Sequence, residues 1–363
     1  MQSPPPGRRL AVKDLFDTAG LRTTYGSAIF ADHVPARTAE SVRLLEAAGY
    51  TNVGKANLHE FAYGVTSENP HYGRVPNPLA EGRTAGGSSG GSAAALAADL
   101  AEAALGSDSA GSIRIPAACC GIAGFKPSFG LVPIDGCFPL APSFDHAGPM
   151  ARGVPECARM MEALAPGFER VDVELADLRV GIAWLGEADP LVRTRVEEAA
   201  AKFPNRRELA LGVPDREQWG AAFRREVLES HAGLYPERAE DYGDDVRRSL
   251  EAAAELTDWE VETARRLRER LRDEVPEALA LADVDLLLTP TLPCVAPPYG
   301  HGSRTVLTKL TALFNLIGWP ALALPCRPAE GGLPASVQLA APIGRDALVL
   351  AAGAALEQAL SLN

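Results

Sequence analysis

Short apolar runs alternate with amphipathic segments along this chain. Residues 10–14 predict a short strand that enters a turn. Residues 38–48 predict a helix, because apolar positions recur at helical spacing, Thr38 can cap the start and Gly49 can end it. Residues 50–53 then predict a second strand. The pattern therefore alternates strand and helix from the start of the chain.

The same alternation continues through two glycine-rich turns. A helix of small residues is predicted at 89–100, directly after the first turn, and a buried strand at 101–105 leads to the second. Strand, turn, helix, strand and turn in this order indicate α/β organisation. Further helices are expected at 152–164 and 345–360, further strands at 179–184, 285–290, 322–325 and 336–339, and a proline-rich loop at 127–149.

Residues 186–280 differ from the rest because they are strongly charged and helical in pattern. Charged residues there, such as Arg224 and Arg268, are expected on solvated helix faces. Neither a repeat nor a convincing linker divides the chain. We therefore predict a single domain spanning residues 1–363.

Composition excludes several classes of function. The net charge of −12 over 363 residues argues against nucleic acid as a partner, which needs a basic surface. No apolar run reaches 18 residues, and residues 1–10 lack the apolar core of a signal peptide, so we expect a cytoplasmic protein without membrane association. The six cysteines are scattered and are expected as free thiols. Metal-ligand spacing is absent, and the sequence predicts neither a metal nor a cofactor.

Two serine-bearing glycine turns carry the candidate chemistry. They occupy residues 85–92 and 106–112, and a lysine, Lys55, lies upstream of both after a predicted strand. Glycine allows close approach of backbone to substrate, so a serine among glycines can be a nucleophile surrounded by free N–H groups. A lysine can act as its base if burial removes the proton from the ammonium. The pattern predicts a serine hydrolase with a lysine base.

Several blocks in the same order resemble the amidase signature family. They lie at residues 54–61, 86–92, 108–116, 121–128, 143–150 and 315–321. The resemblance implies one compact α/β domain with a mixed central β-sheet flanked by helices on both faces. It also implies a catalytic core at about 50–150 and a variable helical region at about 186–280 that shapes the substrate pocket.

The family pattern assigns roles to individual residues. It implies that Ser112 is the nucleophile, Ser88 the bridging serine that relays the proton, and Lys55 the base. It also implies a cis peptide bond before Ser88, where Gly87 offers the least steric resistance.

The supporting roles are an oxyanion hole, a charged brace and a substrate pocket, of which the brace and the pocket are inferred from the positions of the residues in the chain. The backbone N–H groups of the nucleophile loop are expected to form the oxyanion hole, and a charged pair beside that loop is expected to brace it. A substrate pocket is expected from aromatic residues close in the chain to the matching blocks. These residues are Ser109, Ala110, Gly111 and Ser112 for the hole, Asp108 and Arg114 for the brace, and Phe138, Phe144 and Trp319 for the pocket.

The predicted function is an amidohydrolase. It would cleave a carboxamide or carbamoyl C–N bond of a small molecule through an acyl-enzyme on Ser112, without a cofactor. Dimerisation is common in the family, so a homodimer is one expected state. The alternative is the amidase subunit of a tRNA-dependent amidotransferase, which works only inside a complex.

Three weaker alternatives compete for the first glycine turn. Residues 86–90 also match the GxSxG nucleophile elbow of α/β-hydrolases, although the preceding segment is polar where an elbow needs an apolar strand. A phosphate cradle is disfavoured because no Gly-Lys-Ser/Thr follows the glycines. The third alternative is a binding homologue without catalysis.

Overall fold

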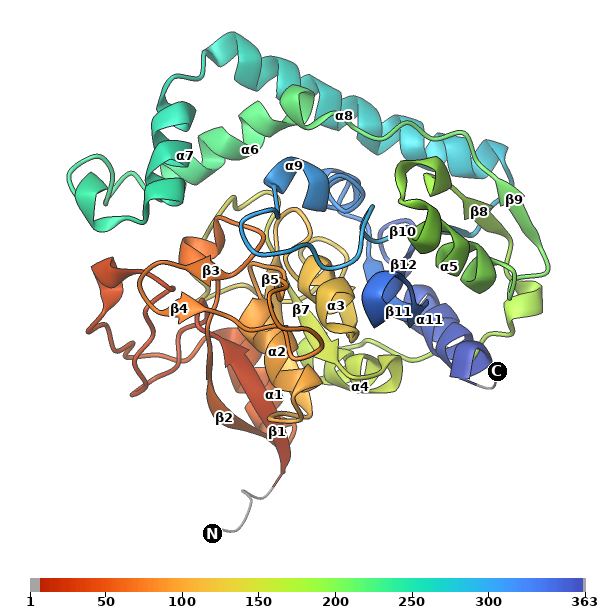
Figure 1. Cartoon of the computed structure of the whole chain (residues 1–363), viewed down its shortest axis with the longest axis horizontal. Coiled ribbons are helices and arrows are strands. Elements are labelled where there is room, and N and C mark those ends of the chain that lie inside the picture. The colour runs from red at the N-terminus through yellow and green to blue at the C-terminus, as the bar shows by residue number, and fades with distance from the viewer. Residues whose placement is uncertain (1–6, 362–363) are drawn as a thin grey trace.

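Ten strands form one mixed sheet, in the order β2-β1-β5-β7-β6-β11-β12-β10-β8-β9 (Figure 1). The computed structural model describes residues 7–361. Strand β1 pairs in parallel with both β2 and β5, whereas the middle of the sheet is antiparallel. The strands are β1 (Arg8–Lys13), β2 (Tyr50–Ala56), β5 (Ala103–Asp108), β6 (Ala123–Lys126), β7 (His146–Ala151), β8 (Val180–Ile182), β9 (Arg206–Glu208), β10 (Leu286–Pro290), β11 (Ala321–Pro328) and β12 (Pro334–Ala340).

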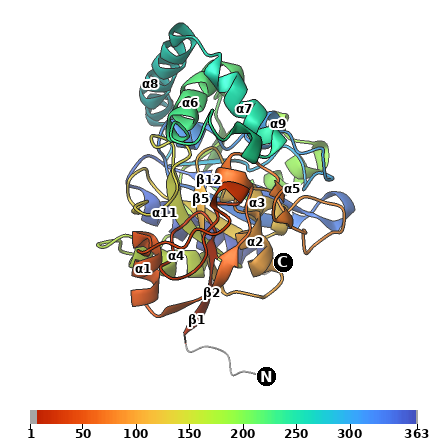
Figure 2. The same ribbon diagram turned by 90° about the vertical axis from the view of Figure 1, so that its left-hand side faces the viewer.

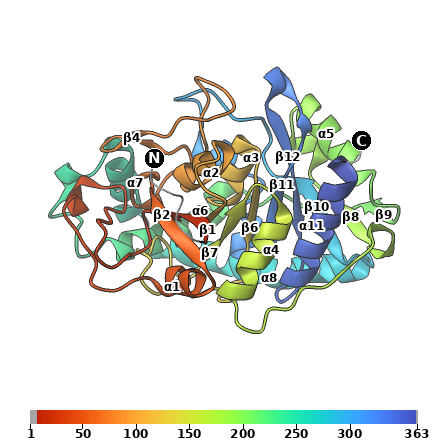
Figure 3. The same cartoon turned by 90° about the horizontal axis from the view of Figure 1, so that it is seen from below.

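Helices cover both faces of this sheet, as Figure 3 shows from below. One layer consists of α2 (Gly90–Ala97), α3 (Arg114–Cys120) and α5 (Pro190–Ala200). The other consists of α1 (Glu40–Ala47), α4 (Val154–Leu164) and α11 (Asp346–Ser361). The predicted fold class, a single compact α/β fold with a mixed central sheet, is confirmed.

A helical cap lies over one end of the sheet. It is formed by α6 (Arg216–Ser230), α7 (Asp244–Ala254) and α8 (Asp258–Leu281), which lie together in both side views (Figures 1 and 2). The remaining α-helices and β-strands of the described residues are the short helices α9 (Arg304–Leu307) and α10 (Leu313–Leu316) and the hairpin of β3 (Glu68–Asn69) and β4 (Gly73–Arg74). Within residues 7–361, none of the helices has both the length and the apolarity needed to cross a membrane.

Most predicted elements are present, with shifted ends. Helix α1 is capped at Ala39 and not at Thr38, whose hydroxyl instead accepts a hydrogen bond from the N–H of Ala19. The strands β6 and β7 were not predicted, because their glycines and prolines are typical of turns. These residues reach strand geometry only because neighbouring strands supply the hydrogen bonds.

Arg268 was expected on a solvated face, and this expectation was wrong. Its side chain is buried, stacks 3.9 Å from the ring centroid of Phe144 and donates hydrogen bonds to the carbonyls of Ser143 and Leu316. A planar guanidinium can satisfy its donors on backbone carbonyls, so a charged residue in a helical pattern does not have to face water.

Helix α2 packs closely against the segment that follows β2, so a larger side chain at Gly91 should lower the stability of the protein. A Cβ at Gly91 would lie 2.2 Å from the carbonyl oxygen of Asn57 and 2.6 Å from its nitrogen. Gly91→Ala should therefore destabilise the protein by about 1–3 kcal/mol, because backbone must move to relieve the clash. The midpoint of thermal unfolding measures the effect.

Gly220 in α6 is the matched control. A Cβ there meets nothing nearer than the Arg216 Cγ at 3.9 Å. Gly220→Ala should stabilise by up to about 1 kcal/mol, because alanine loses less backbone entropy in a helix. Equal shifts of the two variants in one direction would contradict this account of α2 packing.

Candidate active site

Lys13 is the lysine that lies beside the serines. It ends β1, is fully buried, and donates hydrogen bonds of 2.7 Å to the Oγ atoms of Ser88 and Ser107. Among the described residues, no carboxylate lies within ion-pair distance of its Nζ. Burial lowers the pKa of Lys13 to about 7, although the more distant charges of Asp108 and Asp145 oppose that shift.

Lys55, the predicted base, lies elsewhere. Its Nζ is 3.2 Å from Asp14 Oδ1 and donates hydrogen bonds to the carbonyl of Phe16 and the hydroxyl of Thr23. The placement of Lys55 beside Ser88 was therefore wrong. Lys55 instead ties the segment that follows β1 to the edge of the sheet.

The register of two strands explains the error. In the parallel pair of β1 and β2, Lys13 is opposite Ala56, whereas Lys55 is opposite Val12. Successive side chains of a strand point to opposite faces of the sheet. The two lysines are therefore neighbours in the sheet but face opposite sides, and only the face of Lys13 carries α2 and its serine turn.

One signal in the sequence separates the two lysines. Residues 10–12 are continuously apolar, which is typical of a strand with neighbours on both sides and helices on both faces. Residues 50–53 include Thr51 and Asn52, which is typical of a sheet edge, and β2 is the edge strand. A lysine at the end of the apolar run is the one that must be buried.

The turn that carries Ser88 has the predicted cis peptide bond between Gly87 and Ser88. Glycine is required at position 87, because a Cβ there would lie 2.8 Å from the backbone nitrogen of Ser67. The N–H of Ser89 donates a 3.2 Å hydrogen bond to the carbonyl of Ser112. The two serine turns are therefore joined directly, and Ser88 and Ser112 lie on adjoining loops.

A buried ion pair shapes the loop that carries Ser112. Both Asp108 and Arg114 are fully buried, and the guanidinium donates bonds of 2.9 and 3.0 Å to the carboxylate. Burial alone would raise the pKa of Asp108, but the charge and hydrogen bonds of Arg114 hold that pKa well below its usual range. Arg114 also donates to Asn315 and Gln338. The pair has the position that was predicted for a brace.

The carboxylate of Asp108 also accepts a hydrogen bond from one of the amides that were predicted to form the oxyanion hole. The N–H of Gly111 donates a 2.7 Å hydrogen bond to Asp108 Oδ1, so Gly111 was wrongly included among the free amides. The N–H groups of Ser109, Ala110 and Ser112 donate to no other group within residues 7–361. Gly111 instead sets the shape of the loop, since its φ of 135° is strongly disfavoured for other residues.

A histidine base is not supported by the geometry. His146 is buried, and its Nδ1 contacts the carbonyl of Phe144 at 2.7 Å and that of Asp108 at 3.2 Å. Burial keeps the pKa of His146 well below its ordinary value, so the ring is neutral, and its neighbour Asp145 binds the hydroxyl of Ser109. Across the described residues, no group of three or more His, Cys, Asp or Glu is arranged to hold a metal ion.

A small cavity opens at Ser112. Its volume is about 30 Å³, and its lining includes Ser112, Leu140, Phe223 and Arg304. Phe138 lines an adjoining cavity that shares Ser109 and Leu140 with the first.

Phe144 and Trp319 line neither cavity, so their assignment to the pocket was wrong. Phe144 packs under Arg268 and against Phe223, while the carbonyl of Trp319 accepts a hydrogen bond from Lys126. Both side chains are buried and belong to the hydrophobic core.

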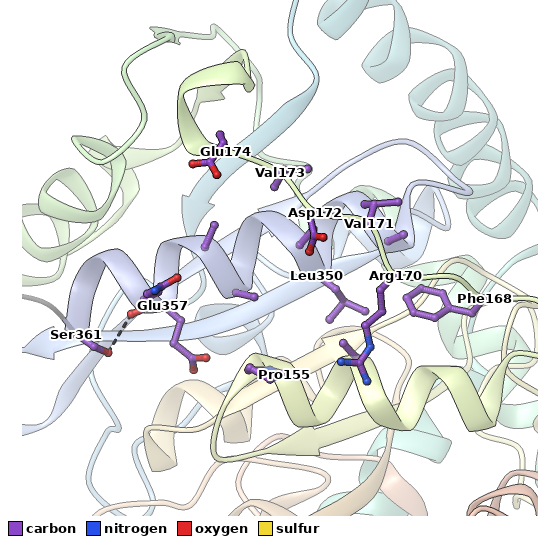
Figure 4. A pocket seen from close by; sticks show the side chains of 16 residues that line it. Pro155, Phe168, Arg170, Val171, Asp172, Val173, Glu174, Leu350, Glu357 and Ser361 are labelled. Carbon is purple, nitrogen blue, oxygen red and sulfur yellow. Dashed lines mark hydrogen bonds between the residues drawn. The ribbon is translucent and has the colours of Figure 1, made fainter.

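Another cavity, of about 830 Å³, lies away from the serines (Figure 4). It runs between α4, α11 and the segment around residues 168–174, and Figure 4 shows Arg170, Asp172 and Glu357 along it. None of the predicted site residues lines this groove.

Comparison with known proteins identifies the chain. A sequence model of the Amidase family matches residues 7–172 and 215–350. The glutamyl-tRNA(Gln) amidotransferase of Thermus thermophilus has a subunit that is 38% identical over 409 aligned positions, covering 98% of this chain and 85% of the relative. A subunit of 1-carboxybiuret hydrolase from Pseudomonas sp. is 36% identical and covers 98% and 84%. The crystal structure of an amidase matches with a TM-score of 0.86 at 37% identity, covering 97% and 84%.

Fold and site together define a hydrolase that acts on amide C–N bonds. The chain belongs to the Amidase family, the amidase signature enzymes, as the sequence motifs predicted. Residues 173–214 lie outside the family match and contain β8, α5 and β9. These elements lie at the far edge of the sheet from Lys13.

The buried ion pair predicts a loss of stability when one partner is removed. Asp108→Asn should cost about 3–5 kcal/mol, because the Arg114 charge is left buried without its counter-ion. Arg266→Gln, which breaks an exposed pair with Glu262, is the control and should leave the unfolding midpoint unchanged.

The pH dependence of unfolding tests the same pair. The folded-state pKa of Asp108 lies below its ordinary value of 3.8. The ionised carboxylate therefore stabilises the folded protein above pH 3.8, and this stabilisation is lost on further acidification. Wild type should therefore lose its advantage over Asp108→Asn as the pH falls below 3.8. A constant difference down to low pH would contradict the assignment.

Proposed function

We propose that this amidase hydrolyses the C–N bond of a small-molecule amide through an acyl-enzyme on Ser112, with Ser88 as relay and Lys13 as base. The observation that carries the proposal is the 2.7 Å contact between Lys13 and Ser88, made by a fully buried lysine without a carboxylate partner. This assigns to Lys13 the role that the sequence pattern had given to Lys55.

The environment of Lys13 suits a base. A lysine can accept a proton only in its neutral form, and burial lowers the pKa of Lys13 to about 7. At neutral pH about half of the molecules then hold the neutral amine. The hydrogen bond to Ser107 fixes the amine in position beside Ser88.

The proposed route moves one proton along three groups. Lys13 takes the proton of Ser88 while Ser88 takes the proton of Ser112, whose Oγ attacks the carbonyl carbon. The proton returns through Ser88 to the leaving nitrogen as the C–N bond breaks. Water then enters and attacks the ester on Ser112, giving the carboxylic acid and the free serine.

Negative charge develops on the carbonyl oxygen of the substrate during the attack, and hydrogen-bond donors are needed to stabilise it. The free amides of Ser109, Ala110 and Ser112 border the cavity and can supply them. Loss of one such donor in other hydrolases lowers kcat by about 10²–10³. The Asp108–Arg114 pair is fully buried and holds these amides in place through the loop.

The alternative is a subunit that needs partners. It is favoured by the amidotransferase subunits among the relatives, one of them 38% identical. The two proposals differ in one observable. A stand-alone amidase releases ammonia from small amides as a purified single chain, whereas a partner-dependent subunit does so only inside its complex.

Exchange of each lysine for arginine tests the mechanism. Arginine keeps the charge but cannot lose its proton in proteins, so it can hold an ion pair and cannot act as base. Lys13→Arg should lower kcat for ammonia release at least about 10³-fold, whereas Lys55→Arg, which keeps the pair with Asp14, should change kcat less than about tenfold. The opposite ranking would return the role of base to Lys55.

Labelling by a fluorophosphonate probe locates the nucleophile independently of the substrate. Intact-mass measurement and peptide mapping should find the label on Ser112 in wild type and none in Ser112→Ala. A label on Ser88 that persists in Lys13→Arg would overturn the relay and favour the nucleophile elbow.

The pH dependence of kcat/KM follows from the base. Because the neutral form of Lys13 is active and its pKa is lowered to about 7, kcat/KM should rise from acid pH, reach half its maximum near pH 7 and level off above pH 8. Initial rates of ammonia release between pH 5 and 9 measure the profile. A flat profile, with chemistry shown to limit the rate, would exclude a lysine base.

A further inference from the structure

Two arginines from different helices line the cavity at Ser112. Arg216 begins α6 in the helical cap, and Arg304 begins α9. Both border the same cavity as Ser112. The cavity has a volume of about 30 Å³, so Arg216 and Arg304 lie close to the nucleophile.

Arg304 is held in place by neutral groups. It donates hydrogen bonds to the carbonyl of Tyr63 and the hydroxyl of Ser249, and its guanidinium lies 4.7 Å from the ring centroid of Tyr63. Asp245 is its nearest carboxylate, at 3.8 Å, and that carboxylate is engaged by His59 at 2.7 Å. The positive charge of Arg304 is therefore only partly offset.

Arg216 has no counter-ion. Within residues 7–361 it forms neither a hydrogen bond nor an ion pair, and its guanidinium lies 5.5 Å from the ring centroid of Trp219. Burial lowers its pKa to about 10, and the charges of Arg304 and Arg224 act in the same direction. A partly buried guanidinium beside other guanidinium groups is a site where an anion gains free energy by binding.

A second cavity leads to this point. It has a volume of about 460 Å³ and shares Arg216 and Thr308 with the cavity at Ser112. The acidic residues on its wall are already engaged, since Glu187 pairs with Lys309 at 2.6 Å and Asp215 caps α6. Arg216 therefore stands between an open vestibule and the nucleophile, with its donors free.

We infer that the substrate is an anionic amide, whose carboxylate binds Arg216 and Arg304 while its carboxamide reaches Ser112. The planar fork of a guanidinium matches the two oxygens of a carboxylate. Because the arginines and the serine border one small cavity, the carboxylate and the amide must be separated by a short chain, as in the monoamide of a small dicarboxylic acid. This inference rests on the proposed function of Ser112.

Matched pairs of amides test the inference. Malonamate, succinamate and glutaramate are compared with propionamide, butyramide and pentanamide, in which a methyl group replaces the carboxylate. For the best of the three anionic amides, kcat/KM should exceed that of its neutral partner by more than about tenfold. Hydrogen bonds to charged groups contribute at least that factor. Arg216→Gln should lower this ratio of kcat/KM values by about tenfold or more. Arg266→Gln removes the same charge from an exposed position on α8 and should leave the ratio unchanged.

Two outcomes separate this inference from the proposed function. If ammonia release depends on Ser112 but the ratio is near one, or is unchanged in Arg216→Gln, the anionic substrate is overturned and the mechanism stands. If none of the amides is hydrolysed, calorimetric titration of Ser112→Ala protein decides. Succinamate should bind more tightly than butyramide, and Arg216→Gln should abolish the difference; equal or absent binding of the two overturns the inference.

Discussion

The site depends on one buried carboxylate. Asp108 accepts hydrogen bonds from the amides of Gly111 and Ile113, from the guanidinium of Arg114 and from the side chain of Asn315. These donors come from the nucleophile loop, from α3 and from α10, so a single group fixes the positions of all three. Because every donor points at one anion, the loop presents its remaining amides toward the cavity and not toward its own interior. The geometry around Ser112 is therefore set by electrostatics in the core beneath it.

A second constraint is that two basic side chains near the serine turns, Lys13 and Arg216, have no carboxylate partner among the described residues. Within residues 7–361 Lys13 is buried without a carboxylate partner, and burial lowers its pKa to about 7, which favours the neutral amine. Arg216 cannot become neutral, since the guanidinium stays protonated at physiological pH. Lys13 contacts Ser88 and Ser107, whereas Arg216 borders the cavity at Ser112. This difference fits a reaction in which one basic group moves a proton while the other holds an anion.

The sequence was most informative about the serine turns. The two glycine-rich loops and the Asp108–Arg114 pair are formed by residues close together in the chain, and the cis bond at Ser88 was implied by the resemblance to the amidase signature family. The fold class follows from the alternation of apolar runs. Strands β6 and β7 could not be predicted, since their pairing partners, and not their own residues, make them strands.

The prediction of which lysine lies beside the serines failed for a related reason. Lys13 and Lys55 both follow short strands, and only the register of β1 against β2 decides which of them faces the serines. Register is a property of two segments together, so neither motif contains it. Arg216 was missed because it comes from the charged region at 186–280, which was expected to be solvated, and Arg304 because it lies outside all of the matching sequence blocks. Their elements meet Ser112 only through the tertiary fold.

The hydrogen-bond partners of Arg114 are far from it in the sequence, and this has a consequence for biosynthesis. Its guanidinium is satisfied by Asn315 and Gln338, which follow it by 201 and 224 residues. During translation the nucleophile loop emerges long before these partners exist, and contacts between such distant segments form late in folding. A nascent chain that ends before residue 338 leaves the guanidinium of Arg114 without its full set of acceptors. The nucleophile loop therefore acquires its full set of hydrogen bonds only after nearly the whole polypeptide has been synthesised.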